Sequence, residues 1–185
     1  MKIEKCQCGY IKKKKKVDFI WLLACVVVAI GIFLTGYLWT KTRANVFTVL
    51  AVLMVLPAAK RVVALVVMVP RKSVEKERYE RVKEAAGACT ILADYVFTST
   101  DKIMHLDLVI IKNGNVLGLV APSRQDVEYM KKYLADSVRK SDASFHVKVV
   151  DSEEKLLKEL GRLTQIQVSP EKEEKVVTYL RTLAV

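Results

Sequence analysis

The chain has 185 residues, of which 52% are hydrophobic, and it contains only 7 glycines, 4 prolines and 4 cysteines. This composition excludes a disordered chain and a disulfide scaffold. Residues 1–70 contain 11 Lys and Arg and 2 acidic residues, whereas residues 71–185 contain 20 and 18. The basic character therefore belongs to the first part of the chain. The nearly neutral second part argues against nucleic acid as a partner.

The first apolar segment, residues 19–40, contains 22 residues without a charge. About 20 apolar residues are enough for a helix to cross the hydrocarbon core of a bilayer. Trp21, Tyr37 and Trp39 lie near its ends, where aromatic side chains prefer the membrane interface. The run is too long for the apolar region of a signal peptide, and a second apolar segment follows. The sequence predicts a transmembrane helix here.

The second apolar segment, residues 46–69, is interrupted by Lys60 and Arg61. We expect a full second span in which these two long side chains reach the nearer interface, with a kink at Pro57. The alternative is a shorter span that ends near Ala59, followed by residues 62–69 lying in the interface.

Lysines and arginines flank the two spans unevenly. Seven lysines precede the first span, two cations lie in the connection at residues 41–45, and six lie between residues 71 and 83. The positive-inside rule therefore predicts a multi-pass protein of the cell membrane with both termini in the cytoplasm. The cations that we expect at the membrane surface are Lys12, Lys13, Lys14, Lys15, Lys16, Lys60 and Arg61. The run of five lysines either sets the topology alone or also binds anionic lipid.

Residues 71–185 have the pattern of a domain with strands and helices. The charged stretch 73–86 is compatible with a helix that begins at Ser73 and ends before Gly87. Asn113 and Gly114 stand between two apolar runs and predict a β-hairpin, because both turn positions need a positive φ. Three strands are expected, at residues 89–97, 103–111 and 116–120.

The rest of this domain alternates between helical and strand patterns. Ser123 is expected to cap a helix, with Asp126 three residues on. The buried stripe of that helix is predicted to be Val127, Met130, Leu134 and Val138. The next elements are a strand at 145–150 and a helix that starts at Asp151 or Ser152 and ends at Leu160, before Gly161. An edge strand at 165–168 and a last helix that begins at Ser169-Pro170 follow.

Together these patterns predict three regions. Residues 1–18 form a basic cytoplasmic segment, residues 19–70 form a two-helix transmembrane hairpin, and residues 71–185 form a cytoplasmic domain. The alternation of elements predicts an α/β or α+β fold for that domain, with a mixed sheet and flanking helices.

The cysteines offer one candidate for metal or redox chemistry. Cys6 and Cys8 have the spacing of half a zinc site, but structural zinc needs four ligands and no second cysteine pair is present. The only two histidines lie in strand patterns of the distal domain. We therefore expect no cofactor, with Cys6 and Cys8 as the candidate metal or redox pair.

The strand pattern of residues 73–150 resembles the core of restriction-endonuclease-like domains. In that family an acid on the second core strand and an acid-x-Lys pair on the third hold a divalent metal. Asp107 matches the first acid, whereas the third strand, residues 116–120, contains neither an acid nor a lysine. The resemblance implies a domain without the catalytic set. The alternative is that Asp107 lies at a sheet edge or on a solvent-facing side of the sheet.

The layout as a whole is similar to a group of small bacterial two-span membrane proteins of uncharacterised function. The similarity rests on the cysteine-containing basic start, the turn at residues 40–45, the Leu56-Pro-Ala-Ala-Lys60 segment and Asp126-Val-Glu-Tyr129. It implies the architecture and no activity.

Three functions follow as hypotheses. The first is a membrane-anchored, non-catalytic module that binds a protein partner or assembles with itself. The second is an enzyme, either a metal-dependent hydrolase acting through Asp107 or a transferase, although the chain has no phosphate-binding loop and no nucleophile elbow. The third is a role at the lipid surface through the lysine run.

Overall fold

The computed structural model describes residues 5–42, 46–99, 101–121, 126–163 and 168–185. The chain divides into two compact units. The helical unit is Ile11–Lys72. The α/β unit combines the N-terminal residues as far as Tyr10 with Ser73–Val185. Each unit is described by itself.

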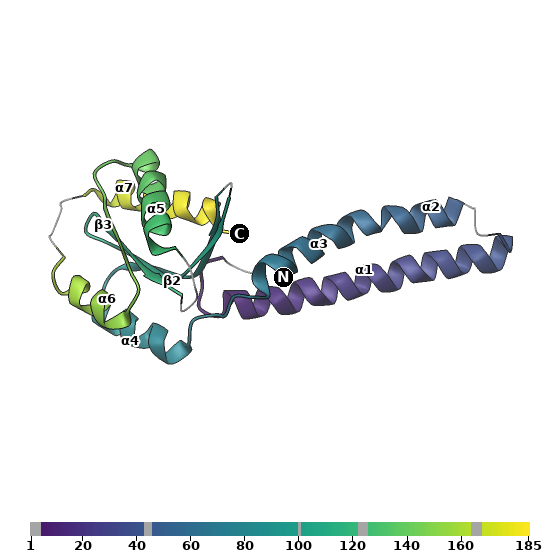
Figure 1. Cartoon of the computed structure of the whole chain (residues 1–185), viewed down its shortest axis with the longest axis horizontal. Helices are drawn as coiled ribbons and strands as arrows, with labels where there is room; N and C mark the ends of the chain where they lie inside the picture. Colours follow the sequence, from purple (N-terminus) through teal and green to yellow (C-terminus); the bar gives the residue numbers. More distant parts are fainter. Residues whose placement is uncertain (1–4, 43–45, 100, 122–125, 164–167) are drawn as a thin grey trace. The chain divides into compact units, whose positions relative to one another are not determined.

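The helical unit contains the two predicted apolar helices (Figure 1). Helix α1 is Tyr10–Thr40, and the second apolar segment forms α2, Val46–Leu53, and α3, Val55–Met68. The helix pattern is interrupted at Met54, three residues before Pro57. Proline has no N–H to donate to the carbonyl four residues earlier, and its ring crowds that carbonyl. The interruption therefore lies where the sequence predicts an irregularity.

The apolar side chains of these helices are not packed into a core. Both helices are long and apolar enough to cross a membrane. In the most apolar stretch of the first helix 6% of the residues are buried, and in that of the second none is. A core helix of a water-soluble protein would instead be mostly buried. The exposed large side chains include Phe19, Trp21, Leu34, Leu38, Leu53 and Leu56.

The α/β unit contains a four-stranded mixed sheet, as the sequence predicts. Its strands are β1, Thr90–Thr98; β2, Ile103–Lys112; β3, Asn115–Val120; and β4, His146–Val150. The strand order is β1-β2-β3-β4. Strands β1, β2 and β3 pair antiparallel, whereas β4 pairs parallel to β3. Helix α5, Val127–Ser141, makes the crossover that a parallel pair requires.

The β2–β3 hairpin is confirmed. Asn113 and Gly114 have φ values of 48° and 70°, and Lys112 pairs directly with Asn115. A two-residue turn with positive φ at both positions matches the twist of the strands. Two local residues thus set the register of the two central strands.

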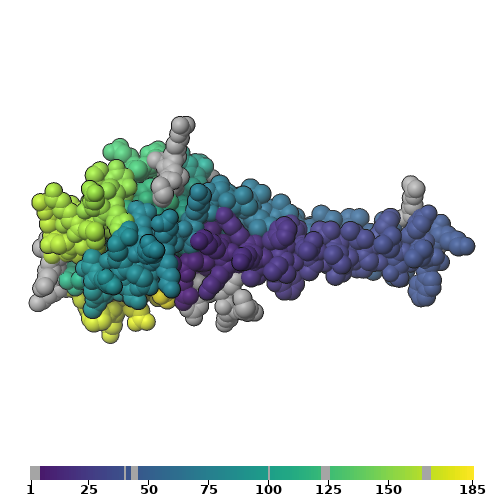
Figure 2. All heavy atoms as spheres, turned by 90° about the horizontal axis from the view of Figure 1, so that it is seen from below, coloured from purple at the N-terminus to yellow at the C-terminus, as the bar shows by residue number. Residues whose placement is uncertain are grey.

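Helices cover both faces of the sheet (Figure 1). Helices α5 and α7, Pro170–Leu183, cover one face. Helices α4, Lys76–Ala86, and α6, Glu153–Leu160, cover the other. Figure 2 looks onto this second face and shows α4, in teal, beside α6, in yellow-green. The unit is therefore a three-layer α/β domain with a separate apolar core on each face of the sheet.

Several predicted helix ends are corrected by the structure. Helix α5 begins after Asp126, whose side chain accepts a hydrogen bond from the Tyr129 backbone N–H, so Asp126 is the cap that the sequence assigned to Ser123. Ser123 lies outside the described residues, as do residues 165–167 of the predicted edge strand, and Val168 lies in no strand. Helix α4 begins at Lys76, because Ser73 is engaged with Asp94.

Residues from both ends of the chain cover the outer edge of β1. The Cys6 carbonyl accepts a hydrogen bond of 2.9 Å from the Ala93 N–H, and the Val185 N–H donates to the Val96 carbonyl at 2.9 Å. Ala184 forms an isolated antiparallel bridge with Phe97. The described residues 5–10 thus belong with the distal domain, although the sequence grouped them with the basic segment 1–18.

Candidate functional site

Two buried carboxylates face each other across β1 and β2. Strand pairing joins Ala93 to Leu108 and Tyr95 to Leu106, so Asp94 and Asp107 occupy opposite positions between these pairs. Both aspartates are almost completely buried. Acids opposite each other in a sheet repel. This pair therefore needs compensating partners.

The backbone is irregular at both aspartates. Asp94 has a φ of 50°, in the left-handed region that few non-glycine residues adopt. Asp107 is the extra residue of a β-bulge, because the register of β2 against β3 shifts between Leu106 and Leu108. Bulges bend a strand and redirect side chains, and they are common beside functional sites.

Asp94 binds the chain that leads into α4. One carboxylate oxygen accepts a hydrogen bond of 2.8 Å from the Val74 N–H, and the other accepts one from the Ser73 hydroxyl. Ser73 is the residue at which the chain enters the α/β unit. Asp94 therefore anchors the start of this unit to its sheet.

Asp107 is paired with a cation from α4. Arg78 donates from Nη1 to Asp107 at 2.7 Å and from Nε to Glu153 at 3.1 Å. Arg81 also binds Glu153, at 3.0 Å. The cluster of Asp107, Arg78, Glu153 and Arg81 thus joins β2, α4 and α6. The interpretation of Asp107 as an edge or solvent-facing residue is wrong, because β2 is an interior strand and Asp107 is only 3% exposed.

The surroundings of Asp107 raise its pKa from 3.8 to about 6. Burial is the largest cause, because it disfavours the charged form. Arg78 acts in the opposite direction, whereas Asp94 and Glu75 add to the increase. In contrast, the hydrogen bond from Arg81 lowers the pKa of Glu153. Asp107 is therefore the carboxylate of this cluster whose charge responds to pH near 6.

The arrangement differs from a metal centre of the endonuclease-like kind. Strand β3 consists of Asn115, Gly118, two valines and two leucines, with no acid and no lysine. Among the described residues, no three His, Cys, Asp or Glu side chains are grouped so that they could hold a metal ion. The cation beside Asp107 is the Arg78 guanidinium. The cluster is thus built for charge compensation between a strand and two helices.

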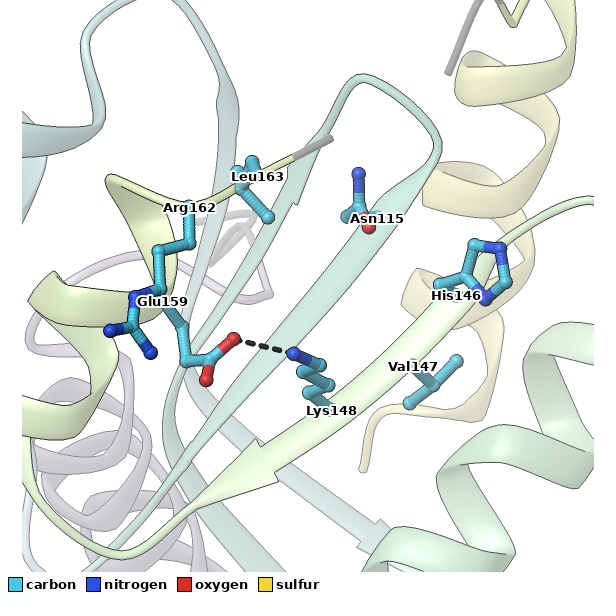
Figure 3. Close-up of a pocket in the computed structure, with 7 residues that line it drawn as sticks. All are labelled: Asn115, His146, Val147, Lys148, Glu159, Arg162 and Leu163. Atoms are coloured by element: carbon cyan, nitrogen blue, oxygen red, sulfur yellow. Dashed lines mark hydrogen bonds and ion pairs between the residues drawn. The ribbon is translucent and has the colours of Figure 1, made fainter. Parts of the chain in front are cut away.

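A surface pocket of about 350 Å³ lies at the other edge of the sheet (Figure 3). Asn115 of β3 and the first residues of β4 form one side, and residues at the end of α6 form the other. Lys148 crosses the pocket to Glu159, with an N–O distance of 2.6 Å. The lining residues are Asn115, His146, Val147, Lys148, Glu159, Arg162 and Leu163.

The side chains that line the pocket can bind a polar group. His146 stands on the β4 side, apart from Glu159 and Arg162 on the α6 side (Figure 3). The Lys148 ammonium is already neutralised by Glu159. Sequence reasoning missed this pocket, because its residues come from β3, β4 and the end of α6 and follow no motif.

The cysteines do not form a chelating pair. Cys6 packs into the core beneath α5 and α7, whereas Cys8 packs against the core beneath α4 and α6. Burial raises the pKa of Cys6 to about 11, which disfavours the thiolate that metal binding and redox exchange require. Cys89 is partly buried, and burial raises its pKa as well. Cys6 acts as a packing residue on the edge of β1.

The predicted membrane-surface cations have specific contacts within the helical unit. Arg61 donates to Asp18 at 2.9 Å, and its guanidinium lies 5.7 Å from the centre of the Trp21 ring. Lys15 donates to the carbonyls of Val69, at 2.9 Å, and Arg71, at 2.6 Å. Lys12, Lys13, Lys16 and Lys60 are exposed.

These contacts join α1 to the end of α3. Lysine near a helix C-terminus satisfies carbonyls that lack intrahelical donors. The Asp18–Arg61 pair compensates the charge that interrupts the second apolar segment.

Comparison with known proteins adds no assignment, since no protein-family model, curated protein or solved structure matches this chain.

Proposed function

We propose that this protein is a membrane-anchored module, in which the two apolar helices form a transmembrane hairpin and the α/β unit is a non-catalytic binding domain in the cytoplasm. The observation that carries the anchor is the continuous apolar surface of α1, α2 and α3. Soluble monomers rarely expose apolar patches above a few hundred Å². A bilayer removes this surface from water.

Contacts between the two ends of the chain support a hairpin topology. Lys5 donates to the Ala184 carbonyl at 2.6 Å, and the Tyr10 hydroxyl donates to the Val185 carbonyl at 2.9 Å. One folded unit therefore includes residues from before the first apolar segment, residues 19–40, and from after the second, residues 46–69. Both sets of residues must lie on one side of the membrane, which requires an even number of crossings. The distribution of lysine and arginine favours the cytoplasmic side.

The polar contacts also support the shorter alternative for the second span, which ends near Ala59. Direct contacts show that Asp18 and Arg61 lie at the same position along the hairpin, and that Lys15 and Val69 do so as well. Residues 62–69 therefore lie beside the lysine run of α1. Since five lysines belong at the headgroups and not in hydrocarbon, we place the hydrocarbon span of the second segment before Lys60.

Cysteine labelling tests the topology. We expect Thr42→Cys, in the turn, to react with a membrane-impermeant maleimide in intact cells. Lys175→Cys, on the exposed face of α7, should react only after permeabilisation. The unmodified protein gives the background from its native cysteines. Equal labelling of both positions in intact cells, or release of the protein by alkaline carbonate, would refute the proposed hairpin.

The binding role of the α/β unit rests on its polar surface. The acid that a hydrolase would use, Asp107, is buried and neutralised by Arg78. Among the described residues of this unit, only Ile103 and Leu157 are large apolar side chains with high exposure. We therefore propose a partner that binds through polar contacts, and the pocket between β4 and the end of α6 offers polar and charged side chains for them.

Crosslinking in intact cells at native abundance, followed by mass spectrometry, tests the binding role. A specific partner, or a self-crosslinked oligomer, is expected. Arg162→Glu should abolish the crosslink, whereas the control Lys175→Glu on α7 should retain it. A clean monomer in the unmodified protein would instead favour the hydrolase hypothesis, which predicts metal-dependent activity that Asp107→Ala removes.

A further inference from the structure

The helical unit contains an apolar groove between its two apolar helices. The groove has a volume of about 540 Å³ and is lined by α1 from Leu22 to Ile30 and by the second segment from Met54 to Val63. The helices are joined by Lys15 and the Asp18–Arg61 pair at one end, and Trp39 stacks edge-on against Phe47, 6.4 Å apart, at the other. Between these contacts, small side chains leave the groove open; they are Cys25, Ala29, Ala58 and Ala59.

The length of the groove matches one leaflet. Eight residue steps from Leu22 to Ile30 correspond to about 12 Å of helix. One leaflet contributes about 15 Å of hydrocarbon, half the thickness of the bilayer core. The groove reaches the level of Lys60 and Arg61, because its lining runs from Met54 and Ala58 to Val62 and Val63, which follow these two cations in the chain. It therefore extends from the headgroup level toward the middle of the bilayer.

The charge at the headgroup end is strongly positive. Residues 11–18, 60–61 and 71–72 together contain nine Lys and Arg residues and one acid, Asp18. Lys60 is exposed beside the groove, and the Arg61 side chain is 43% exposed although it is paired with Asp18. A second copy of the helical unit would bring an equal set of cations against this end, which like-charge repulsion disfavours. An anionic headgroup would instead be attracted.

We propose that this groove binds one anionic phospholipid of the adjoining leaflet, with an acyl chain between α1 and α3 and its phosphate beside Lys60 and Arg61. This inference rests on the proposed membrane hairpin. An acyl chain fills an apolar space that water cannot enter favourably, and the phosphate supplies the counter-charge. The lipid then completes the packing of the hairpin.

The test uses the full-length protein, reconstituted in vesicles of equimolar phosphatidylglycerol and phosphatidylcholine. After mild solubilisation, native mass spectrometry counts the lipids retained by each chain. One phosphatidylglycerol per chain is expected. Ala29→Phe with Ala58→Phe fills the groove and should lower retention about tenfold. The control, Val27→Phe with Val52→Phe, adds the same bulk at exposed positions outside the groove and should retain the lipid.

A second variant tests the headgroup contact in an intact groove. Lys60→Gln should reduce the preference for phosphatidylglycerol over phosphatidylcholine about fivefold. The proposal is overturned if both pairs of phenylalanine substitutions retain lipid equally, if Lys60→Gln leaves the preference unchanged, or if the unmodified protein emerges as a lipid-free dimer. Resistance to alkaline carbonate is measured first, so that a failure of the membrane anchor is recognised separately from a failure of lipid binding.

Discussion

Asp107 is the residue whose charge state most affects the α/β unit. Its pKa in the folded protein, about 6, is higher than its ordinary value of 3.8. The folded state therefore binds this proton more tightly than the unfolded state does. The stabilisation from the protonated carboxyl is fully present below pH of about 4 and is lost as pH rises through about 6. The loss is on the order of 3 kcal/mol.

This behaviour predicts the effect of Asp107→Asn. The amide cannot ionise, so the variant should lack this loss of stability between acid and neutral pH. We expect its unfolding temperature at neutral pH to equal or exceed that of the unmodified protein. Thermal unfolding of the full-length protein in detergent, as a function of pH, measures the difference. The control Asp101→Asn, at an exposed acid, should leave the pH profile as it is. Parallel profiles for all three proteins would contradict the prediction.

Helix α4 is fixed to the sheet by the half-buried Arg78, which binds Asp107, whereas the exposed Arg81 binds Glu153 of α6. Arg78→Ala would leave the buried Asp107 carboxylate without its cation, which typically costs about 3 kcal/mol. Arg81→Ala removes only a contact with Glu153 from a side chain that is 59% exposed, so it should change stability little. Unfolding temperatures of the two variants at neutral pH test this order.

A double substitution separates the charge effect from loss of packing. If the cost of Arg78→Ala comes from the unpaired carboxylate, Asp107→Asn should recover most of it, so the two changes would not add. Additive losses would show that the aliphatic part of Arg78 matters instead. The comparison thus shows whether Arg78 of α4 stabilises the fold through its ion pair or through its packing.

At the scale of the whole molecule, the Asp18–Arg61 pair holds the second apolar segment against α1 at the boundary of the hydrocarbon. Asp18→Ala leaves Arg61 uncompensated at the boundary of the hydrocarbon, where an arginine costs less than the roughly 2.5–3.5 kcal/mol that it costs at the bilayer centre. We expect a several-fold lower carbonate-resistant fraction in isolated membranes. The exchange Asp18→Arg with Arg61→Asp restores an ion pair and should recover membrane integration. Failure of this exchange to recover it would show that the pair is not the cause.

The chain pattern alone determined those features that depend on neighbouring residues. The Asn113-Gly114 hairpin, the apolar stripe of α5 and the two long apolar helices follow from turn chemistry and from the period of apolar residues. The mixed sheet with flanking helices follows from the order of these elements. Membrane crossing and topology stay predictions that the labelling experiment tests.

The tertiary structure decided which distant residues meet. Only the strand register places Asp94 opposite Asp107, and only the docking of α4 brings Arg78 to them. Likewise, Cys6 is a packing residue because the N-terminal segment lies along β1. Such contacts depend on which faces of the helices and strands pack against each other. The local period of apolar residues shows that a face is apolar, but it does not show which other face covers it. The sequence therefore determined the elements of this protein, and packing between them decided its charge cluster, its pocket and its groove.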